Sequence, residues 1–362
     1  MRKSQHGIIT PTQATIIIIS KTLSVGILTL PRTAANDVGT PDVWIALLIS
    51  SLVPLAMGFV IITLNQRYPN QTFYEYSDLI VGRFFTLFIS LFMILYFIIG
   101  TIFAVRIMAV VVETYLLEGT PVTILIVLVL WLSLYLIVGG ITSIARVFQI
   151  IFPLTILTFI VIALMGIGLF DLDHLRPVLG EGIRPVFNIK SMTFSSLGIE
   201  IILIIQAFMT DQHKAKKVIF LGVLIPTVLY LLTLVMVIGA LSIDGVTNLT
   251  WPTILLIQSF EFPQLFFERL DSLFLIIWIM QIFATVSISF YAASLGFSQL
   301  FNKDIKRFIY GLLPILFILS MIPQNLHQLF WLADMNANVG IVLFGVVPCL
   351  LLLISFIRRK VQ

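Results

Sequence analysis

The chain contains 362 residues, of which 59% are hydrophobic and only 10% are charged, and its mean hydropathy is +1.11. A soluble globular protein needs far more polar surface, so this composition excludes that class and indicates a polytopic helical membrane protein. We expect one transmembrane domain over residues 1–362, because no polar stretch is long enough for a separate soluble domain. The net charge of +4 fits membrane topology, and nothing indicates a nucleic-acid partner.

The sequence offers no constellation for covalent chemistry. Its single cysteine, Cys349, lies in the last apolar segment, and its four histidines are scattered without metal-ligand spacing. The serines lack a histidine partner, and the glycine-rich stretches lack phosphate-loop spacing. We therefore expect no catalytic site, no metal and no cofactor, and a protein that is not an enzyme.

Ten segments are predicted as membrane spans, since a span needs about 20 mostly apolar residues. In chain order they are Thr12–Val38, Pro41–Leu64, Arg83–Leu116, Pro121–Val138, Ile144–Leu169, Met192–Thr210, Lys216–Leu241, Asp271–Phe297, Ile305–Met321 and Asn338–Phe356. The expected fold is therefore all-α with ten transmembrane helices. An even number of spans places both termini on one side of the membrane.

The distribution of lysine and arginine predicts which side that is. With the N-terminus inside, fourteen basic residues lie on the inner side: Arg2, Lys3, Arg67, Arg83, Arg146, Lys214, Lys216, Lys217, Lys303, Lys306, Arg307, Arg358, Arg359 and Lys360. Five lie on the outer side: Arg32, Arg176, Arg184, Lys190 and Arg269. By the positive-inside rule, both termini are expected in the cytoplasm.

The first segment is poorly suited to a continuous helix. Gly26 costs roughly 1 kcal/mol there relative to alanine, and Pro31 lacks an amide donor. Inside a membrane, backbone groups are left unpaired only where protein or a cavity satisfies them. An interrupted first helix therefore indicates a ligand site.

The sixth segment repeats the pattern of the first. Shifted by 172 positions, Ser24–Ile27 aligns with Ser196–Ile199, and both quartets consist of serine, an apolar residue, glycine and isoleucine. Many transporters consist of two inverted halves with broken helices at equivalent places. This predicts five spans over residues 12–169, five over 192–357, and broken helices 1 and 6. The alternative is two small-residue patches that only allow close helix packing.

Broken helices expose amides at one half-helix and carbonyls at the other. Such amides suit a carboxylate and such carbonyls suit a cation or an ammonium group. A zwitterionic amino acid matches both, and small uncharged nutrients match less strongly.

Four of the charges within predicted spans are singled out, because an ionisable residue inside a span is a functional candidate. Lys21 and Glu200 flank the two breaks at similar depth, so they can pair, or Lys21 can replace a bound cation. The alternative is that Lys21 extends to the inner surface and Glu200 binds a helix end. Arg106 and Glu113 share one face of the third helix, and we expect structural ion pairing for both.

Two tyrosines within spans need hydrogen-bond partners in protein. Tyr96 lies near the middle of the third helix, and Tyr291 shares a face of the eighth with Ser287 and Ser294. Either tyrosine can line the ligand cavity or form an interhelical hydrogen bond.

The chain resembles the spore germinant-receptor B subunits (the GerAB/GerKB-type spore permease family) of the amino acid–polyamine–organocation superfamily. The resemblance covers essentially the whole chain. It is carried by the following stretches: Gly26–Pro31, Arg67–Pro69, Tyr74–Tyr76, the Arg-Pro-Val repeats at 176–178 and 184–186, Trp251–Thr253, Phe267–Phe274 and Trp278.

This resemblance implies a LeuT-like fold with ten helices in a five-plus-five inverted repeat. It implies a receptor subunit in the spore inner membrane that works with A and lipoprotein C subunits and binds amino acids or sometimes sugars. By position, the superfamily's ligand-contacting residues correspond to Thr22, Ser24, Val25, Gly26, Tyr96, Gly198, Ile199, Ser287 and Tyr291.

Two other functions fit the same sequence. The first is a proton- or ion-coupled amino acid transporter, which fold alone does not exclude. Some proton-coupled relatives carry a lysine on the fifth helix, and none lies within Ile144–Leu169 here. The second is a structural anchor that assembles the receptor complex without binding ligand.

Overall fold

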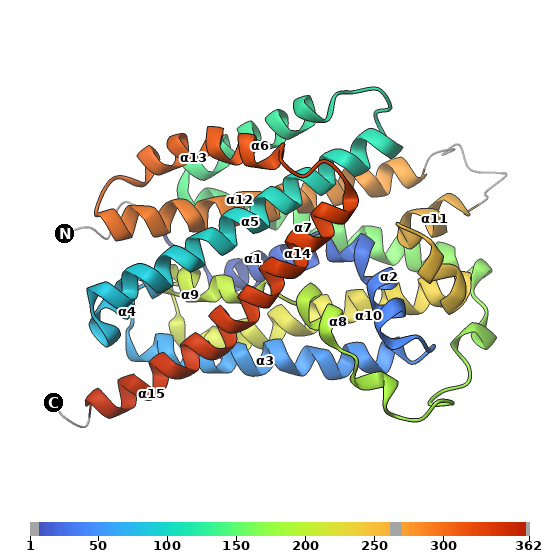
Figure 1. The fold of residues 1–362 in the computed structure, drawn as a ribbon, viewed down its shortest axis with the longest axis horizontal. Coiled ribbons are helices and arrows are strands. Elements are labelled where there is room, and N and C mark those ends of the chain that lie inside the picture. The colour runs from blue at the N-terminus through green and yellow to red at the C-terminus, as the bar shows by residue number, and fades with distance from the viewer. Residues whose placement is uncertain (1–6, 261–269, 360–362) are drawn as a thin grey trace.

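The computed structural model describes residues 7–260 and 270–359. In this part of the chain the protein is an elongated bundle of helices (Figure 1). The helices are α1 (Pro11–Leu23), α2 (Gly26–Val38), α3 (Val43–Arg67), α4 (Phe73–Val81), α5 (Arg83–Tyr115), α6 (Val122–Val138), α7 (Gly140–Gly166), α8 (Lys190–Ser195), α9 (Ile202–Ile205), α10 (Ala215–Asn248), α11 (Pro252–Gln258), α12 (Leu270–Phe301), α13 (Ile305–Ser320), α14 (Leu326–Ile341) and α15 (Val347–Arg359). Arg2, Lys3, Arg269, Lys360 and the 267–269 part of the family motif lie outside the described residues.

Six described helices are long and apolar enough to cross a membrane, and there are eight spans when each of two bent helix pairs counts as one. The protein is therefore a multi-pass membrane protein. A total of ten also requires α6 and α13, which have only 17 and 16 residues, so ten spans stays a prediction.

The two bent pairs are the first and sixth predicted spans. The chain bends by 53° between α1 and α2 and by 46° between Pro185–Ser195 and Ile199–Phe208. Both predicted breaks are therefore present, and they fall at Ser24–Val25 and at Ser196–Gly198.

Local sequence explains how α1 and α2 begin and end. Thr10 and Gln13 form a capping box at the start of α1, with Pro11 in the first turn. Pro31 lies inside α2 and cannot donate to the carbonyl of Ile27 four residues earlier. The Thr253 hydroxyl donates to that carbonyl instead, at 3.0 Å, so α11 supports α2, the second half of the first span.

The structure departs from the sequence predictions in two short helices and in the last span. The short helices α4 and α11 were not predicted, because seven to nine residues are too few for a span. The last span begins at Leu326 rather than Asn338 and contains a π-helical turn at Val342–Val346. The polar residues Asp334, Asn336 and Asn338 lower the hydropathy of α14. The part of the last span that precedes Asn338 was therefore not predicted.

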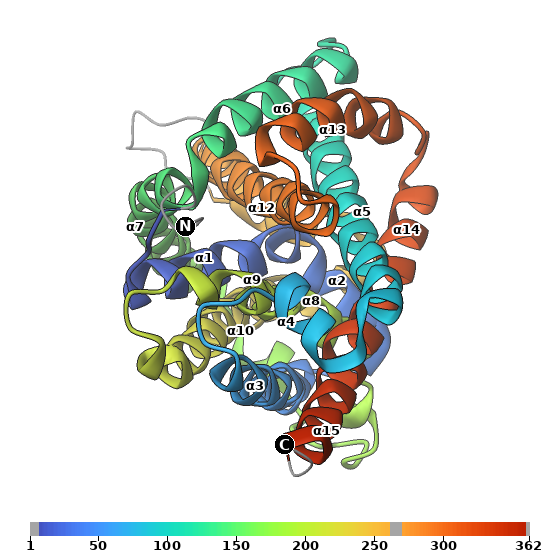
Figure 2. The same ribbon diagram turned by 90° about the vertical axis from the view of Figure 1, so that its left-hand side faces the viewer.

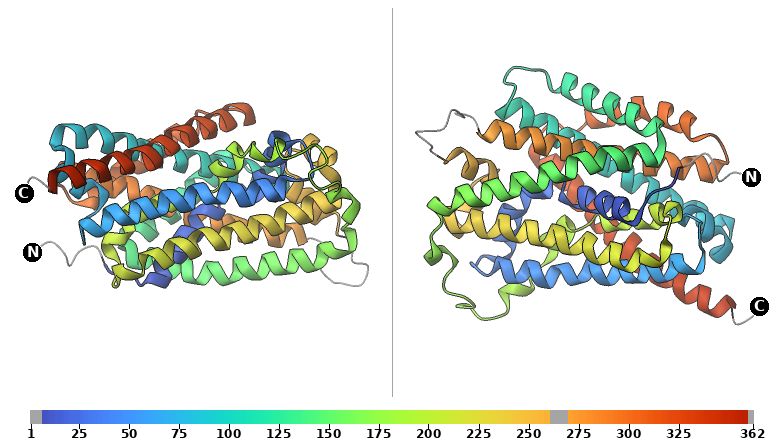
Figure 3. Two further views of the ribbon diagram at one scale, coloured as in Figure 1. Left: turned by 90° about the horizontal axis from the view of Figure 1, so that it is seen from below. Right: turned by 180° about the vertical axis from the view of Figure 1, so that it is seen from behind.

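The first span lies inside the bundle. Helix α1 packs against α7, α10 and α12, and Figure 2 shows it surrounded by them. The long helices α3, α7 and α10 run along the long axis of the molecule (Figure 3). The breaks are thus enclosed by protein, as freed backbone groups require in a membrane.

We call the end of the bundle that carries α4 and the last turn of α15 the terminal end; it is on the left in Figure 1. The guanidinium of Arg67 lies 3.7 Å from the ring centroid of Phe356 there, so α3 and α15 end side by side. The positive-inside count predicts that this end faces the cytoplasm.

Candidate functional site

The two helix breaks touch each other. Gly198 has φ +157° and ψ −27°, a conformation that favours glycine. A Cβ at this position would lie 2.8 Å from both the backbone nitrogen and the Cα of Thr22, so the α1 backbone fills the space a side chain would need. The sequence alignment of the two breaks therefore corresponds to a direct contact in the fold.

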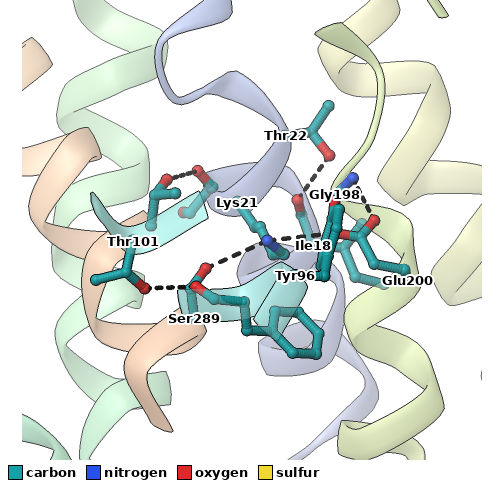
Figure 4. Close-up of polar contacts among 11 residues, drawn as sticks. Ile18, Lys21, Thr22, Tyr96, Thr101, Gly198, Glu200 and Ser289 are labelled. Carbon is teal, nitrogen blue, oxygen red and sulfur yellow. Dashed lines mark hydrogen bonds and ion pairs between the residues drawn. The ribbon is translucent and has the colours of Figure 1, made fainter. Parts of the chain in front are cut away.

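A buried ion pair joins the breaks. The Nζ of Lys21 lies 3.2 Å from Oε1 of Glu200, and the two side chains are 9% and 0% exposed. The same Oε1 accepts a hydrogen bond from the Tyr96 hydroxyl at 3.0 Å, and Oε2 accepts one from the Gly198 amide at 2.6 Å (Figure 4). The carboxylate is thus paired and hydrogen-bonded, which a buried charge needs in order to be tolerated.

Lys21 is held on its other side by α12 and α5. Its ammonium donates to Oγ of Ser289 at 3.3 Å and lies 5.3 Å from the ring centroid of Phe97 and 5.9 Å from that of Tyr96. Both ring distances are within the range of cation–π attraction. The structure therefore shows Lys21 paired inside the bundle and not extended to the membrane surface.

Tyr230 of α10 binds backbone carbonyls next to both breaks. Its hydroxyl donates to the Thr22 carbonyl at 2.6 Å and lies 3.4 Å from the Ser195 carbonyl, so it satisfies oxygens that the breaks expose. It also occupies the place where a Cβ on Gly26 would be. Tyr230 was not among the predicted site residues, although a tyrosine hydroxyl within an apolar span was itself a signal.

Replacing Tyr230 by phenylalanine is expected to lower stability by about 1–2 kcal/mol, because the Thr22 carbonyl loses its donor. This would appear as a fall of about 2 °C in the Tm of the purified protein. Tyr310→Phe on α13, where the side chain is 56% exposed, is the matched control. Equal Tm values for the two variants would show that the hydroxyl does not support the break.

The remaining predicted site residues divide into two groups. Ser24 and Val25 are buried at the first break, and Thr22 bonds within its own helix through the Ile18 carbonyl. The side chain of Ile199 is directed toward α3, since its Cδ1 lies 3.4 Å from the position that a Cβ on Gly58 would take.

On α12 the side that contacts α1 carries Ser289 and Thr285, and not the predicted Ser287. Ser287 is buried and its hydroxyl has no partner among the described residues. Ser289 contacts Lys21, and Thr285 donates to the Ser20 carbonyl at 3.2 Å. Both lie on the α1-facing side of α12. The sequence could have indicated this face too, because positions 285 and 289 are one turn apart.

Tyr291 lines a large cavity instead of the ion pair. The cavity measures about 1140 Å³ and lies at the terminal end, between residues 70–75, 137–140, 207–210 and 298–306. Tyr291 is two residues beyond Ser289 on α12, but Lys21, Glu200 and Ser289 do not line this cavity.

Arg106 and Glu113 form no ion pair with any residue the structure describes. Arg106 is partly buried, and its Nε has no described hydrogen-bond partner. The expected structural pairing is therefore not found between these residues. Neither Arg106 nor Glu113 is among the described hydrogen-bond partners of the Lys21–Glu200 pair, which are Ser289, Tyr96 and Gly198.

A sequence profile of the family described as "Spore germination protein" matches residues 8–329. The chain belongs to this spore permease family. It is 46% identical to spore germination protein YndE of Bacillus subtilis (strain 168) over 353 residues, covering 97% of each chain. It is 32% identical to spore germination protein B2 of the same organism, covering 100% of this chain and 98% of the relative.

Solved structures with low sequence identity to this chain share its fold. MhsT in complex with L-phenylalanine superposes with a TM-score of 0.73 at 11% identity, over 98% of this chain and 99% of MhsT. Mhp1, a nucleobase-cation-symport-1 family transporter, superposes with a TM-score of 0.72 at 11% identity, over 97% of this chain and 80% of Mhp1. The predicted LeuT-like fold is thereby confirmed.

Proposed function

We propose that this protein is the nutrient-binding subunit of a spore germination receptor, and that it binds a small ligand such as an amino acid where the two broken helices meet. The observation that supports this most is the Lys21–Glu200 ion pair, which joins the breaks inside the bundle. Relatives named as spore germination proteins along the full chain support the biological setting.

The pair has the chemistry to exchange partners with a zwitterion. Lys21 offers an ammonium to a ligand carboxylate, and Glu200 with Tyr96 offers acceptors to a ligand ammonium. A ligand inserted between them replaces one ion pair by two, so the buried charges stay compensated. An uncharged sugar would instead leave the pair intact and use the surrounding hydroxyl and backbone groups.

Binding would act by favouring one arrangement of the two halves. In the receptor, the A subunit and the lipoprotein C subunit in the spore inner membrane would receive that shift. The terminal end faces the cytoplasm in this proposal, and the nutrient enters from the opposite end.

Ligand-induced stabilisation of the purified protein tests the proposal. We expect L-alanine, L-proline or L-leucine to raise the Tm, since a ligand at 100 times its Kd stabilises by about 2.7 kcal/mol. L-Alaninamide and propionate, which each lack one of the two charges, should give clearly smaller shifts. Stabilisation by none of the amino acids would leave the structural-anchor role, and stabilisation by a sugar alone would reject charge exchange.

The cavity at the terminal end favours a second candidate, a proton- or ion-coupled amino acid transporter. An opening of about 1140 Å³ at that end reaches Tyr291 on α12, the helix whose Ser289 contacts Lys21. Reconstituted vesicles distinguish the two functions. Accumulation of labelled alanine driven by a pH or sodium gradient, absent from empty vesicles, would favour the transporter.

A further inference from the structure

Asn65, near the end of α3, lies at the centre of a buried hydrogen-bond network outside the ion pair. Its Nδ2 donates to the Ile202 carbonyl at 3.1 Å and to Oε1 of Gln206 at 3.0 Å. Its Oδ1 accepts from the Tyr76 hydroxyl at 2.8 Å, and the side chain of Asn65 is only 3% exposed. Both ends of the amide are therefore used, so its orientation is fixed by three partners.

On one side the network leads to the surface of the terminal end. The ring of Tyr76 in α4 stacks on Tyr68 with centroids 5.4 Å apart, and the Tyr68 hydroxyl lies 2.9 Å from Oγ of Ser355 in α15. Asn65 thus connects α3 with the short helix α4 and, through Tyr68, with the last helix.

On the other side the network holds the inner half of the sixth span, which begins just after Gly198 and carries Glu200. This segment is short and irregular: a 3₁₀ turn, four α-helical residues and another 3₁₀ turn. Few backbone bonds within it resist bending, so an external donor to the Ile202 carbonyl has a large share in fixing its position.

The inner halves of the two broken spans are also bonded to each other. The Ile9 amide donates to the Phe208 carbonyl at 2.9 Å, and the Thr210 amide donates to the Ile9 carbonyl at 2.9 Å. Ile9 lies two residues before the start of α1, whose far end carries Lys21. The two segments are therefore joined at both ends, by this backbone bridge and by the Lys21–Glu200 pair.

We propose that residues 9–23 and 199–210 form one body and that Asn65 is the positioning residue that holds this body against α3, α4 and α15. A change in the ion pair is then passed to α4 at the terminal end through Asn65. The structural part of this proposal stands without a ligand, and only its last step rests on the proposed function.

Amide hydrogen exchange in the purified full-length protein tests the structural part without a ligand. In Asn65→Ala, amides of residues 202–210 are expected to exchange about ten-fold faster, the effect of losing one or two hydrogen bonds. The Ile9 amide should accelerate with them, while α5 stays unchanged. Ser50→Ala is the control, because Ser50 is buried in the same helix but bonds only to the Leu47 carbonyl.

If the amides of residues 202–210 exchange faster but the Ile9 amide does not, the claim that the two segments form one body is wrong. If none of these amides exchanges faster, the proposed role of Asn65 is wrong. If α5 also accelerates, Asn65→Ala has disturbed the whole fold, and Tyr76→Phe decides. That variant removes only the hydroxyl bonded to Asn65. It should give a smaller acceleration at the same amides, about three-fold, and unchanged exchange would reject the proposal.

Spores carrying these variants test the coupling. With L-alanine as the probe, Asn65→Ala should keep the ligand-induced Tm rise but reduce the germination rate at saturating alanine at least ten-fold relative to Ser50→Ala. An unchanged rate would overturn the coupling. A missing Tm rise in the unsubstituted protein would count against the proposed function instead, and exchange would still decide the role of Asn65.

Discussion

Glu200→Gln is expected to destabilise the protein by about 3 kcal/mol or more, because it leaves the Lys21 ammonium buried without a counter-charge. A glutamine amide also has only one acceptor oxygen, whereas both oxygens of Glu200 face donors: the Tyr96 hydroxyl and Lys21 on one side and the Gly198 amide on the other. The NH₂ group of glutamine would therefore face a donor in either orientation. Thermal unfolding of the purified protein measures the loss, and germination of variant spores measures its effect on the response.

The double variant Lys21→Met/Glu200→Gln is the informative control for that loss. Because it removes both charges, it should recover much of the stability lost in Glu200→Gln while still failing to respond to an amino acid. If the stability loss of the double variant equals the sum of the losses in Lys21→Met and Glu200→Gln, the two charges do not interact. A normal response in the double variant would show that the pair does not bind the ligand.

Gly26→Leu is expected to abolish the nutrient response and leave folded protein in the membrane. Even a Cβ at this position meets the Tyr230 hydroxyl, so a larger side chain displaces that hydroxyl from the Thr22 carbonyl and fills the break. The cost in stability should be about 1–3 kcal/mol, typical of overpacking. Germination assays, with the amount of membrane protein measured by immunoblotting, separate loss of response from loss of protein.

Gly311→Leu on α13 is the matched control, since nothing lies within 4 Å of a Cβ at that helical glycine. A normal response in Gly26→Leu would place the ligand site elsewhere. Gly198 is a poorer probe than Gly26, because its Cβ would meet the α1 backbone at 2.8 Å. Substitution there should reduce folded protein as well as the response.

The sequence was sufficient to predict both breaks and the charges beside them. Glycine and serine in a long apolar segment are locally unfavourable for a helix, so the patterns at Ser24–Ile27 and Ser196–Ile199 were visible without a structure. Lys21 and Glu200 were conspicuous because charges are rare in spans. Their mutual distance, however, depended on how the two halves pack.

Ser289 and Asn65 were not predicted as functional residues, because polar side chains also occur on other faces or at the ends of their helices. On α12, hydroxyl side chains occur at 285, 287, 289 and 294, and only packing against α1 selects Ser289. The role of Asn65 was hidden for a similar reason. A polar residue near the end of a span is ordinary, and its partners at Ile202 and Gln206 are 137 and 141 residues away.

A density map of the protein with the amino acid that gives the largest Tm rise tests the central proposal most directly. The proposal predicts ligand density between Lys21 and Glu200, with the ligand carboxylate at the Lys21 ammonium and the original 3.2 Å contact opened. Density confined to the cavity beside Tyr291, with the Lys21–Glu200 pair intact, would contradict it.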